Sequence, residues 1–359
     1  MSQTPLLSYI VLSYNYEHYI DHTIRSILRQ TVQDFEIVVV DDCSKDNSVE
    51  VVKSFRDPRI RLLCNERNLG GAGSYNRAVS AARGEWLVNL DADDWIAPHK
   101  AEVQLELAAK RPELDIIGSY VVFLDADGAP HPNAEVLENT VNQPHEFGRV
   151  DTWVGTNNLC RSSVMMRRSA HMRIGLDDPN MARAPDYELW TRALREGCGI
   201  ATVPEKLTYL RLHSSGVTHA DPLGTLLELA YAMLRNLMPL AERRALYPTI
   251  QRILAWVCRN HELSRLAPIE RYRLIGMLMQ ATEVGDFASF KAALSDSKHD
   301  AEWATTGRRA LALFSDGAGP YQDVRTLQRE VAAQVAAVDW WRQRAQTWER
   351  EYMNAARAS

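Results

Sequence analysis

Three aspartates within four positions form the strongest chemical feature of the sequence. Asp91, Asp93 and Asp94 directly follow the apolar segment Trp86–Leu90. Carboxylates this close repel one another, and the repulsion is relieved when a cation or another bound partner supplies positive charge. Mg²⁺ and Mn²⁺ take oxygen ligands, and proteins often hold them with one or two carboxylates together with substrate phosphates. The cluster therefore indicates either a metal–phosphate site or a solvated acidic turn that caps the next helix.

Two further aspartates end a second apolar segment. Asp41 and Asp42 follow Val38–Val40 and precede Ser44. An ionised Asp only accepts hydrogen bonds, so one of these carboxylates could bind the N–H and O–H groups of a base or ribose. The alternative is that Asp42 or Ser44 caps the next helix. Two acidic strand ends in one sheet favour a binding site.

Apolar segments rich in Val, Ile and Leu alternate with helix-like segments as far as Leu124. We expect strands at Leu6–Leu12, Phe35–Val40, Arg59–Leu63, Glu85–Leu90 and Asp115–Leu124. We expect helices at Tyr19–Arg29, Asn47–Phe55, Ser74–Ala82 and His99–Lys110. This alternation predicts an α/β fold with a mostly parallel sheet that helices cover on both faces. Such sheets bind ligands outside the carboxyl ends of their strands, where both acidic groups would lie.

The chain after Leu124 is less regular. We expect a polar loop at Pro132–Gly148, almost continuous helix from Leu223 onward, and a Gly-rich linker at Asp316–Pro320. The predicted organisation is a catalytic domain at 1–220, a helical domain at 221–315 and an amphipathic helix at 321–359.

Small or apolar residues recur every seven positions in that last segment, at Val324, Val331, Val338, Ala345 and Tyr352. Such a heptad pattern predicts a coiled coil, through which the chain would form a homo-oligomer. The alternatives are a helix that packs on its own protein and an amphipathic helix on a membrane surface.

The composition is that of an ordinary globular protein, with 46% hydrophobic and 24% charged residues in a chain of 359. A net charge of -5 argues against a nucleic-acid partner. The five cysteines lack C-x-x-C spacing, which argues against a zinc site and a disulfide framework. We expect a cytoplasmic protein, with peripheral association with the inner face of the cell membrane as the alternative.

Taken in order along the chain, these motifs resemble those of the inverting family 2 glycosyltransferases, which have the GT-A fold. Ile10–Asn15 is similar to the family's first strand and Phe35–Asp42 to its second. Asn68–Gly70 and Ala82–Glu85 then precede Asp91–Asp94, the D-x-D motif, in the family's order. The likeness covers residues 1–220.

The resemblance implies a nucleotide-sugar site at the carboxyl edge of the sheet. It assigns contacts with the donor to Ser13, Tyr14, Asn15, Asp42, Asn68, Arg83, Asp91 and Arg211. Within this set Asp42 would contact uracil, and Arg83 would contact phosphate. It assigns a divalent metal, Mn²⁺ or Mg²⁺, to Asp91, Asp93, Asp94 and His213.

The segment Ala184–Arg192 resembles the one that carries the family's catalytic base, which would be Asp186. Pro185 suits a first helical turn, so Asp186 would lie near the positive end of a helix. The alternative is that Asp186 only complements the helix dipole, worth about 0.3–1 kcal/mol. Glu188 is the second candidate for the base.

Strand alternation would place Arg211 and His213 on one face. By resemblance, Arg211 would neutralise charge on the leaving group, and His213 would bind the metal or a phosphate. A lone His is otherwise a surface or core residue. Asn157, Asn158 and Arg161–Arg168 are expected beside the acceptor.

The resemblance therefore implies an inverting transferase that moves a sugar from a nucleotide diphosphate, with UDP favoured, to an acceptor hydroxyl. The acceptor would be a glycan, a lipid-linked glycan or a small molecule, as in surface glycan or polysaccharide biosynthesis. One alternative is a sugar nucleotidyltransferase, which the absence of glycine from Ser13–Glu17 disfavours. The other is a catalytically degenerate nucleotide-binding scaffold that assembles through its C-terminal helix.

Overall fold

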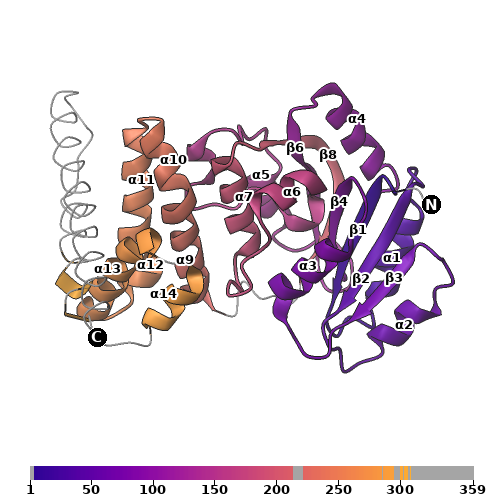
Figure 1. The fold of residues 1–359 in the computed structure, drawn as a ribbon, viewed down its shortest axis with the longest axis horizontal. Helices are drawn as coiled ribbons and strands as arrows, with labels where there is room; N and C mark the ends of the chain where they lie inside the picture. Colours follow the sequence, from indigo (N-terminus) through magenta and orange to yellow (C-terminus); the bar gives the residue numbers. More distant parts are fainter. Residues whose placement is uncertain are drawn as a thin grey trace, which may run out of the picture. The chain divides into compact units, whose positions relative to one another are not determined.

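The computed structural model describes residues 4–212, 221–284, 286–294, 300–301, 303–305 and 308. The chain divides into two compact units, of which the first is Met1–Leu240 and the second begins at Ala241 (Figure 1). The first unit contains the sheet and all the predicted site residues that the structure describes. This unit extends past residue 220, the expected end of the catalytic domain, as far as Leu240. The predicted linker and coiled coil, 316–359, lie outside the described residues.

The first unit is built on one mixed sheet. Its strands are β1 (Leu7–Ser13), β2 (Phe35–Asp41), β3 (Ile60–Cys64), β4 (Trp86–Asp91), β5 (Trp95–Ile96), β6 (Leu114–Leu124), β7 (Met165–Arg167) and β8 (Gly199–Arg211). They lie in the order β3-β2-β1-β4-β7-β6-β8-β5. Strands β3, β2, β1 and β4 are parallel, whereas β7 is antiparallel to both β4 and β6. The prediction of a mostly parallel sheet is confirmed, and the short strands β5 and β7 are additions to it.

Helices flank this sheet. They are α1 (Ile20–Leu28), α2 (Ser48–Ser54), α3 (Gly70–Ala81), α4 (Lys100–Lys110), α5 (Ala134–Val141), α6 (Arg168–Ile174), α7 (Pro185–Arg195) and α9 (Pro222–Ala232), with the 3₁₀ turns η1 (Val150–Trp153) and η2 (Arg161–Ser163). A π-helix, η3 (Met233–Leu237), continues α9 and leads into α10 (Met238–Arg243). In the second unit the described helices are α11 (Tyr247–Cys258), α12 (His261–Ser264), α13 (Pro268–Val284) and α14 (Phe287–Leu294).

Strand alternation divides the core between the two faces of the sheet. Tyr9 and Val11 of β1 point to the face that α1, α2 and α4 cover. Ile10 points to the other face, against Tyr75 and Ala78 of α3. Figure 1 shows the central strands with helices on both sides. Because both faces are covered, the carboxyl edge of the strands remains available for a site.

Two local expectations for the first unit are wrong. The segment Pro132–Gly148 is not a loop throughout, because α5 packs Leu137 and Val141 against β6, and Asn142 bonds the backbone of Val121 at 2.8 Å. Helix α3 begins at Gly70 rather than Ser74. The glycines that precede Ser74 therefore start a helix and do not form a flexible loop.

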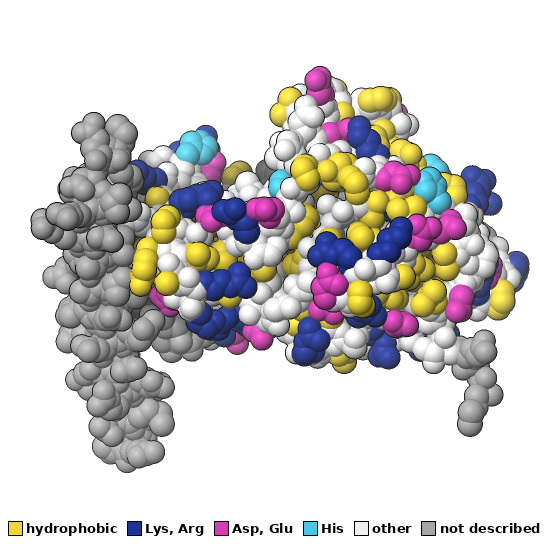
Figure 2. Space-filling model, turned by 90° about the horizontal axis from the view of Figure 1, so that it is seen from above, with side chains coloured by type: hydrophobic (Ala, Val, Ile, Leu, Met, Phe, Trp, Pro, Cys, Tyr) yellow, Lys and Arg dark blue, Asp and Glu magenta, His cyan; other side chains and the backbone are white. Residues whose placement is uncertain are grey.

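No helix among the described residues has the length and the apolar character needed to cross a bilayer. On the described part of the face in Figure 2, Lys and Arg side chains alternate with Asp and Glu side chains. That mixture agrees with a modest net charge of -5.

Candidate active site

The ends of three parallel strands bring the first site residues together. In the register of β1 with its neighbours, Ser13 pairs with Asp41 and Leu12 with Asp91. The strands β2, β1 and β4 therefore end in a row. Because the three strands are parallel neighbours, their carboxyl ends lie at the same edge of the sheet, although the residues there are far apart in sequence.

The loops after β1 and β2 are tied to each other. Asn15 and Cys43 both have positive φ, 60° and 68°. The backbone N–H of Asn15 donates to Ser44 Oγ at 2.9 Å, and Asn15 Oδ1 accepts from the N–H of Lys45 at 2.8 Å. Tyr14, between the strand and this turn, is 45% exposed. The two loops thus form one surface, with the Tyr14 ring open to solvent.

Asp42 fixes the start of α3. Its carboxylate accepts hydrogen bonds from the N–H groups of Leu69 and Gly70, at 2.7 and 2.9 Å, and from Asn65 Nδ2 at 2.7 Å. Asn68 supports the same turn, because its side chain bonds the Asp42 carbonyl and the Gly70 N–H. A carboxylate at a helix N-terminus is favoured by the helix dipole. The structure therefore brings Asp42 and Asn68 together at the start of α3, where Gly70 has the positive φ of 74° that favours glycine.

The acidic cluster forms a tight turn at the end of β4. The N–H of Asp94 donates to the Asp91 carbonyl at 3.1 Å. The hydroxyl of Thr23, on α1, lies 2.7 Å from the carbonyl of Ala92 and 2.8 Å from that of Asp94. Asp93 and Asp94 are 8% and 5% exposed. The turn is thus clamped from α1 and is largely shielded from water.

Burial and crowding change the acidity of this turn. Burial, and next the charge of Asp93, raise the pKa of Asp91 to about 6. The same two causes raise the pKa of Asp94 well above its usual value. Burial and the three carboxylates also raise the pKa of Tyr16, from the loop after β1. The site concentrates negative charge that a bound cation would relieve.

Arg211 closes the other side of the turn. Its backbone N–H donates to Asp94 Oδ1 at 2.8 Å, and its Nε donates to the Asp93 carbonyl at 3.2 Å. Its guanidinium lies 4.6 Å from the ring centroid of Tyr19 and 5.1 Å from that of Trp95. Arg211 therefore lies beside the acidic turn. His213 lies outside the described residues.

Two residues of the turn η2, Arg161 and Ser162, interact with the acidic turn. Ser162 Oγ accepts a hydrogen bond from the N–H of Asp91 at 3.1 Å. Arg161 pairs with the fully buried Asp177 carboxylate at 2.7 Å and stacks on Tyr75 at 4.4 Å. The charge of Arg161 opposes the rise in the pKa of Asp91. A partly buried cation thus balances part of the charge of the acidic turn.

Asp186 reaches this site from the first turn of α7. Its Oδ2 accepts from Asn157 Nδ2 at 2.8 Å, and its Oδ1 accepts from the N–H of Tyr187 at 2.8 Å. Its charge contributes to the raised pKa of Asp91 and of Cys160, the latter reaching about 12 chiefly through burial. The carboxylate therefore interacts electrostatically with the acidic turn. Each of its oxygens keeps a second lone pair for another partner.

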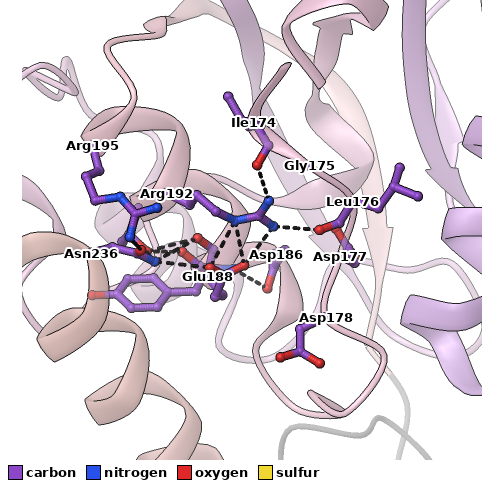
Figure 3. Close-up of polar contacts among 12 residues, drawn as sticks. Ile174, Gly175, Leu176, Asp177, Asp178, Asp186, Glu188, Arg192, Arg195 and Asn236 are labelled. Atoms are coloured by element: carbon purple, nitrogen blue, oxygen red, sulfur yellow. Dashed lines mark hydrogen bonds and ion pairs between the residues drawn. The ribbon is translucent and has the colours of Figure 1, made fainter. Parts of the chain in front are cut away.

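Glu188 is not an equivalent candidate. Its carboxylate pairs with Arg192 at 2.9 Å and accepts from Asn236 Nδ2 at 3.2 Å (Figure 3). Only 7% of the residue is exposed. These contacts commit Glu188 to packing between α7 and η3.

Arg83 is the site residue that the structure does not bring to this edge. It lies between α3 and β4, where its guanidinium pairs with Glu36 at 2.7 Å and its N–H bonds the same carboxylate. Glu36 is the second residue of β2, at the amino edge of the sheet. The expectation of a phosphate contact from Arg83 is corrected accordingly. Conversely, sequence reasoning missed Tyr16, in the loop after β1, and Thr23, on α1. The position of Tyr16 so soon after a strand end was a usable signal, whereas Thr23 had none.

The donor set fits a divalent cation shared with a diphosphate. Among the described residues, no three His, Cys, Asp or Glu side chains form a group that could hold an ion by themselves. Mg²⁺ and Mn²⁺ often take one or two protein carboxylates and complete their shell with phosphates and water. Asp91, Asp93 and Asp94 offer such oxygens, and crowding with Asp93 contributes to the raised pKa values of Asp91 and Asp94.

Comparisons with known proteins agree on one family. A family model described as glycosyl transferase family 2 matches residues 8–175. An uncharacterized glycosyltransferase of Methanocaldococcus jannaschii is 30% identical over 212 residues, 58% of this chain and 71% of that protein. A putative teichuronic acid biosynthesis glycosyltransferase of Bacillus subtilis is 30% identical over 216 residues, 60% of this chain and 82% of that protein.

Two solved structures share the fold. S. aureus TarS in complex with UDP-GlcNAc has a TM-score of 0.60 at 17% identity, over 89% of this chain and 94% of that one. A mannosyltransferase from Pyrobaculum calidifontis in complex with GDP-Man and Mn²⁺ has a TM-score of 0.52 at 19% identity, over 88% and 89%. These likenesses confirm the expected GT-A type of fold.

Proposed function

The chain belongs to glycosyltransferase family 2, and we propose that it transfers a sugar from a nucleotide-diphosphate sugar to an acceptor hydroxyl, with inversion. The observation that carries this proposal is the convergence of Asp186 with the acidic turn, because the charge of Asp186 contributes to the raised pKa of Asp91. One carboxylate can then take a proton while its neighbours bind the leaving group. A single displacement from one face inverts the anomeric carbon.

In this proposal Asp186 is the general base. It accepts the proton of the acceptor hydroxyl as the oxygen attacks the anomeric carbon. Asn157 donates to Asp186 Oδ2, and the Tyr187 N–H donates to Oδ1, so the carboxylate is held in one orientation. A base that is already oriented loses little entropy when the acceptor binds.

Asp91, Asp93 and Asp94 would hold Mn²⁺ or Mg²⁺ together with the diphosphate, with His213 as a further ligand. Such an ion, when bound, supplies a Lewis acid that stabilises charge on a leaving diphosphate. Arg211 adds a fixed positive charge beside the turn, held by the Asp93 carbonyl and the rings of Tyr19 and Trp95.

UDP is the proposed nucleotide, and Ser13, Tyr14, Asn15 and Asp42 are its proposed contacts. Asp42 already accepts three hydrogen bonds, which leaves about one of its four lone-pair sites for the N–H of a base. The complex of TarS with UDP-GlcNAc supports this choice only through a shared fold. Surface glycan or polysaccharide biosynthesis is the proposed context, supported by the Bacillus subtilis relative.

The deciding experiment compares Asp186→Asn with Glu196→Gln, an exposed carboxylate at the other end of the same helix. Purified protein is assayed with a panel of sugar nucleotides and Mn²⁺. We expect D186N to lose about 10²–10⁴-fold in transfer rate, because a general base contributes that much. Donor affinity should be retained, and E196Q should behave as wild type.

Normal transfer by D186N would exclude Asp186 as the base. Calorimetry with UDP, with and without Mn²⁺, addresses the scaffold alternative. If the wild-type chain binds UDP without any effect of Mn²⁺ and turns over no donor, the nucleotide-binding scaffold replaces the transferase.

A further inference from the structure

A buried glutamate outside the matched family region holds the backbone that leads into α7. Glu228, on α9, accepts hydrogen bonds from three consecutive N–H groups, those of Ala182, Arg183 and Ala184, at 2.8, 2.7 and 2.7 Å. The residue is 5% exposed. Hydrogen bonds to an ionised acceptor are about twice as strong as neutral ones. Three of them on one carboxylate fix this stretch of backbone firmly.

The start of α7 depends on this contact because it has no strong cap of its own. The N-cap is Ala184, whose side chain cannot accept a hydrogen bond, and Pro185 follows it. Asp186 accepts from Tyr187 N–H, yet its other oxygen faces Asn157. Glu228 therefore places, from α9, a negative charge at the N-terminal end of α7, where the helix dipole favours it, and it fixes the three residues that lead into the helix.

A second contact from the same helical segment reaches the middle of α7. Asn236, in the π-helix η3, is fully buried and donates to Thr191 Oγ1 at 3.1 Å and to Glu188 Oε1 at 3.2 Å. Arg195 donates to Asn236 Oδ1 at 2.8 Å. Figure 3 shows Glu188, Arg192, Arg195 and Asn236 in one connected group. A π-helical turn inside a helix is rare and is frequently found at functional sites.

We propose that Glu228 is a positioning residue for Asp186, and that residues 222–237 belong to the transfer machinery although the family match ends at residue 175. The inference rests on the proposed role of Asp186 as the base. Asp186 is two residues from the last N–H that Glu228 holds. A small shift of that backbone moves the base relative to the acidic turn, and displacements near 1 Å can cost about 10²-fold in rate.

The test compares Glu228→Gln and Glu228→Ala with Glu36→Gln. Gln has the shape of Glu, but its NH₂ group would face one of the backbone N–H donors. Glu36 is the matched control, because it is 2% exposed and accepts from Ser8 Oγ and Arg83 N–H at the opposite edge of the sheet. Both Gln variants remove one buried charge.

We expect kcat of E228Q for transfer to fall about 10- to 100-fold, with the donor KM changed by less than about two-fold. E36Q should keep kcat and KM even where its stability falls. Amide exchange at Ala182, Arg183 and Ala184 should quicken in E228Q and not in E36Q. If E228A does not fold, E228Q alone decides the matter.

Wild-type kcat in E228Q, or an equal loss in E228Q and E36Q, would overturn the positioning role. That outcome is separate from failure of the proposed function, which D186N reports. If D186N is inactive and E228Q is fully active, the base stands and the inference falls.

Discussion

At the scale of single residues, Lys100 is a buried cation that the proposed chemistry does not use. It is the first residue of α4, it is fully buried, and its Nζ donates to Gln104 Oε1 at 3.0 Å. Burial lowers the pKa of Lys100 from 10.5 to about 7. The charged ammonium group therefore lowers the free energy of unfolding, because in the folded protein it has lost its contact with water.

Replacing Lys100 with Met should stabilise the protein, and the gain should depend on pH. The folded state releases the proton near pH 7, while the unfolded chain keeps it up to its ordinary pKa of 10.5. Between those values the unfolded state binds more protons, so native stability rises with pH. Below the folded pKa the full cost is present, and there K100M should gain about 1–3 kcal/mol.

The measurement is urea unfolding of both proteins at about pH 6 and about pH 9. The advantage of K100M should shrink at the higher pH. An advantage of equal size at both values, or a less stable variant, would show that the Lys100 ammonium is not the cause.

At the scale of secondary-structure elements, the helix α1 matters because it supports a turn distant in sequence. Thr23 is 1% exposed, and its hydroxyl reaches two carbonyls in the turn between Asp91 and Asp94. The shape of the acidic turn thus depends on how α1 packs beneath β4.

Thr23→Val keeps the side-chain volume and removes the hydroxyl. We expect a loss of about 0.5–1.5 kcal/mol in the free energy of unfolding, since one hydrogen bond to the turn disappears. We also expect weaker Mn²⁺-dependent binding of UDP, because the carboxylates lose their support. Calorimetry measures the second effect, with Thr23→Ser as the control that retains the hydroxyl. Unchanged metal-dependent affinity in T23V would mean that the turn holds its shape without α1.

Most of the elements around the site follow from local patterns in the sequence. The strands β1, β2 and β4 begin and end within one residue of their expected positions, because buried parallel strands are continuous apolar segments. The acidic residues were expected at strand ends, and the structure has them there. The place of Asp186 came from a resemblance, and only the tertiary structure brings it near Asp91.

What local patterns did not predict depends on partners distant in the chain. Arg83 follows a helix as a phosphate ligand might, but Glu36, 47 positions earlier, takes its guanidinium. Helix α3 begins at Gly70, whose N–H is accepted by Asp42, 28 positions earlier. In the sequence Glu228 is a single acidic residue in an apolar helix, and only the structure reveals its three backbone donors. Such contacts join residues that are distant in the sequence, so they produce no repeating pattern from which they could be predicted.

At the scale of the whole molecule, the chain is a catalytic unit that ends at Leu240 followed by a second, helical unit. The heptad pattern of residues 324–352 lies outside the described residues, and the coiled coil stays a prediction. It predicts self-association that does not depend on the catalytic site.

Val331→Asp together with Val338→Asp should convert an oligomer of the full chain to a monomer, because charges at core heptad positions oppose helix pairing. Light scattering of the wild type and the double variant measures the mass. A control pair, Ala332→Asp and Ala336→Asp, adds the same charge at heptad positions b and f, away from the predicted core of the helix pair. A monomeric wild type, or a double variant with the wild-type mass, would contradict the prediction.

The contact between Glu228 and residues 182–184 also limits where two related transferases can be joined to make a chimera. A chimera joined at residue 220, between the two helices, pairs an α7 from one parent with an α9 from another. The α9 of the second parent can lack a carboxylate within hydrogen-bond distance of these three N–H groups. A junction after Leu240 keeps Asp186 and Glu228 from one parent, and the helices of the second unit can then be exchanged together.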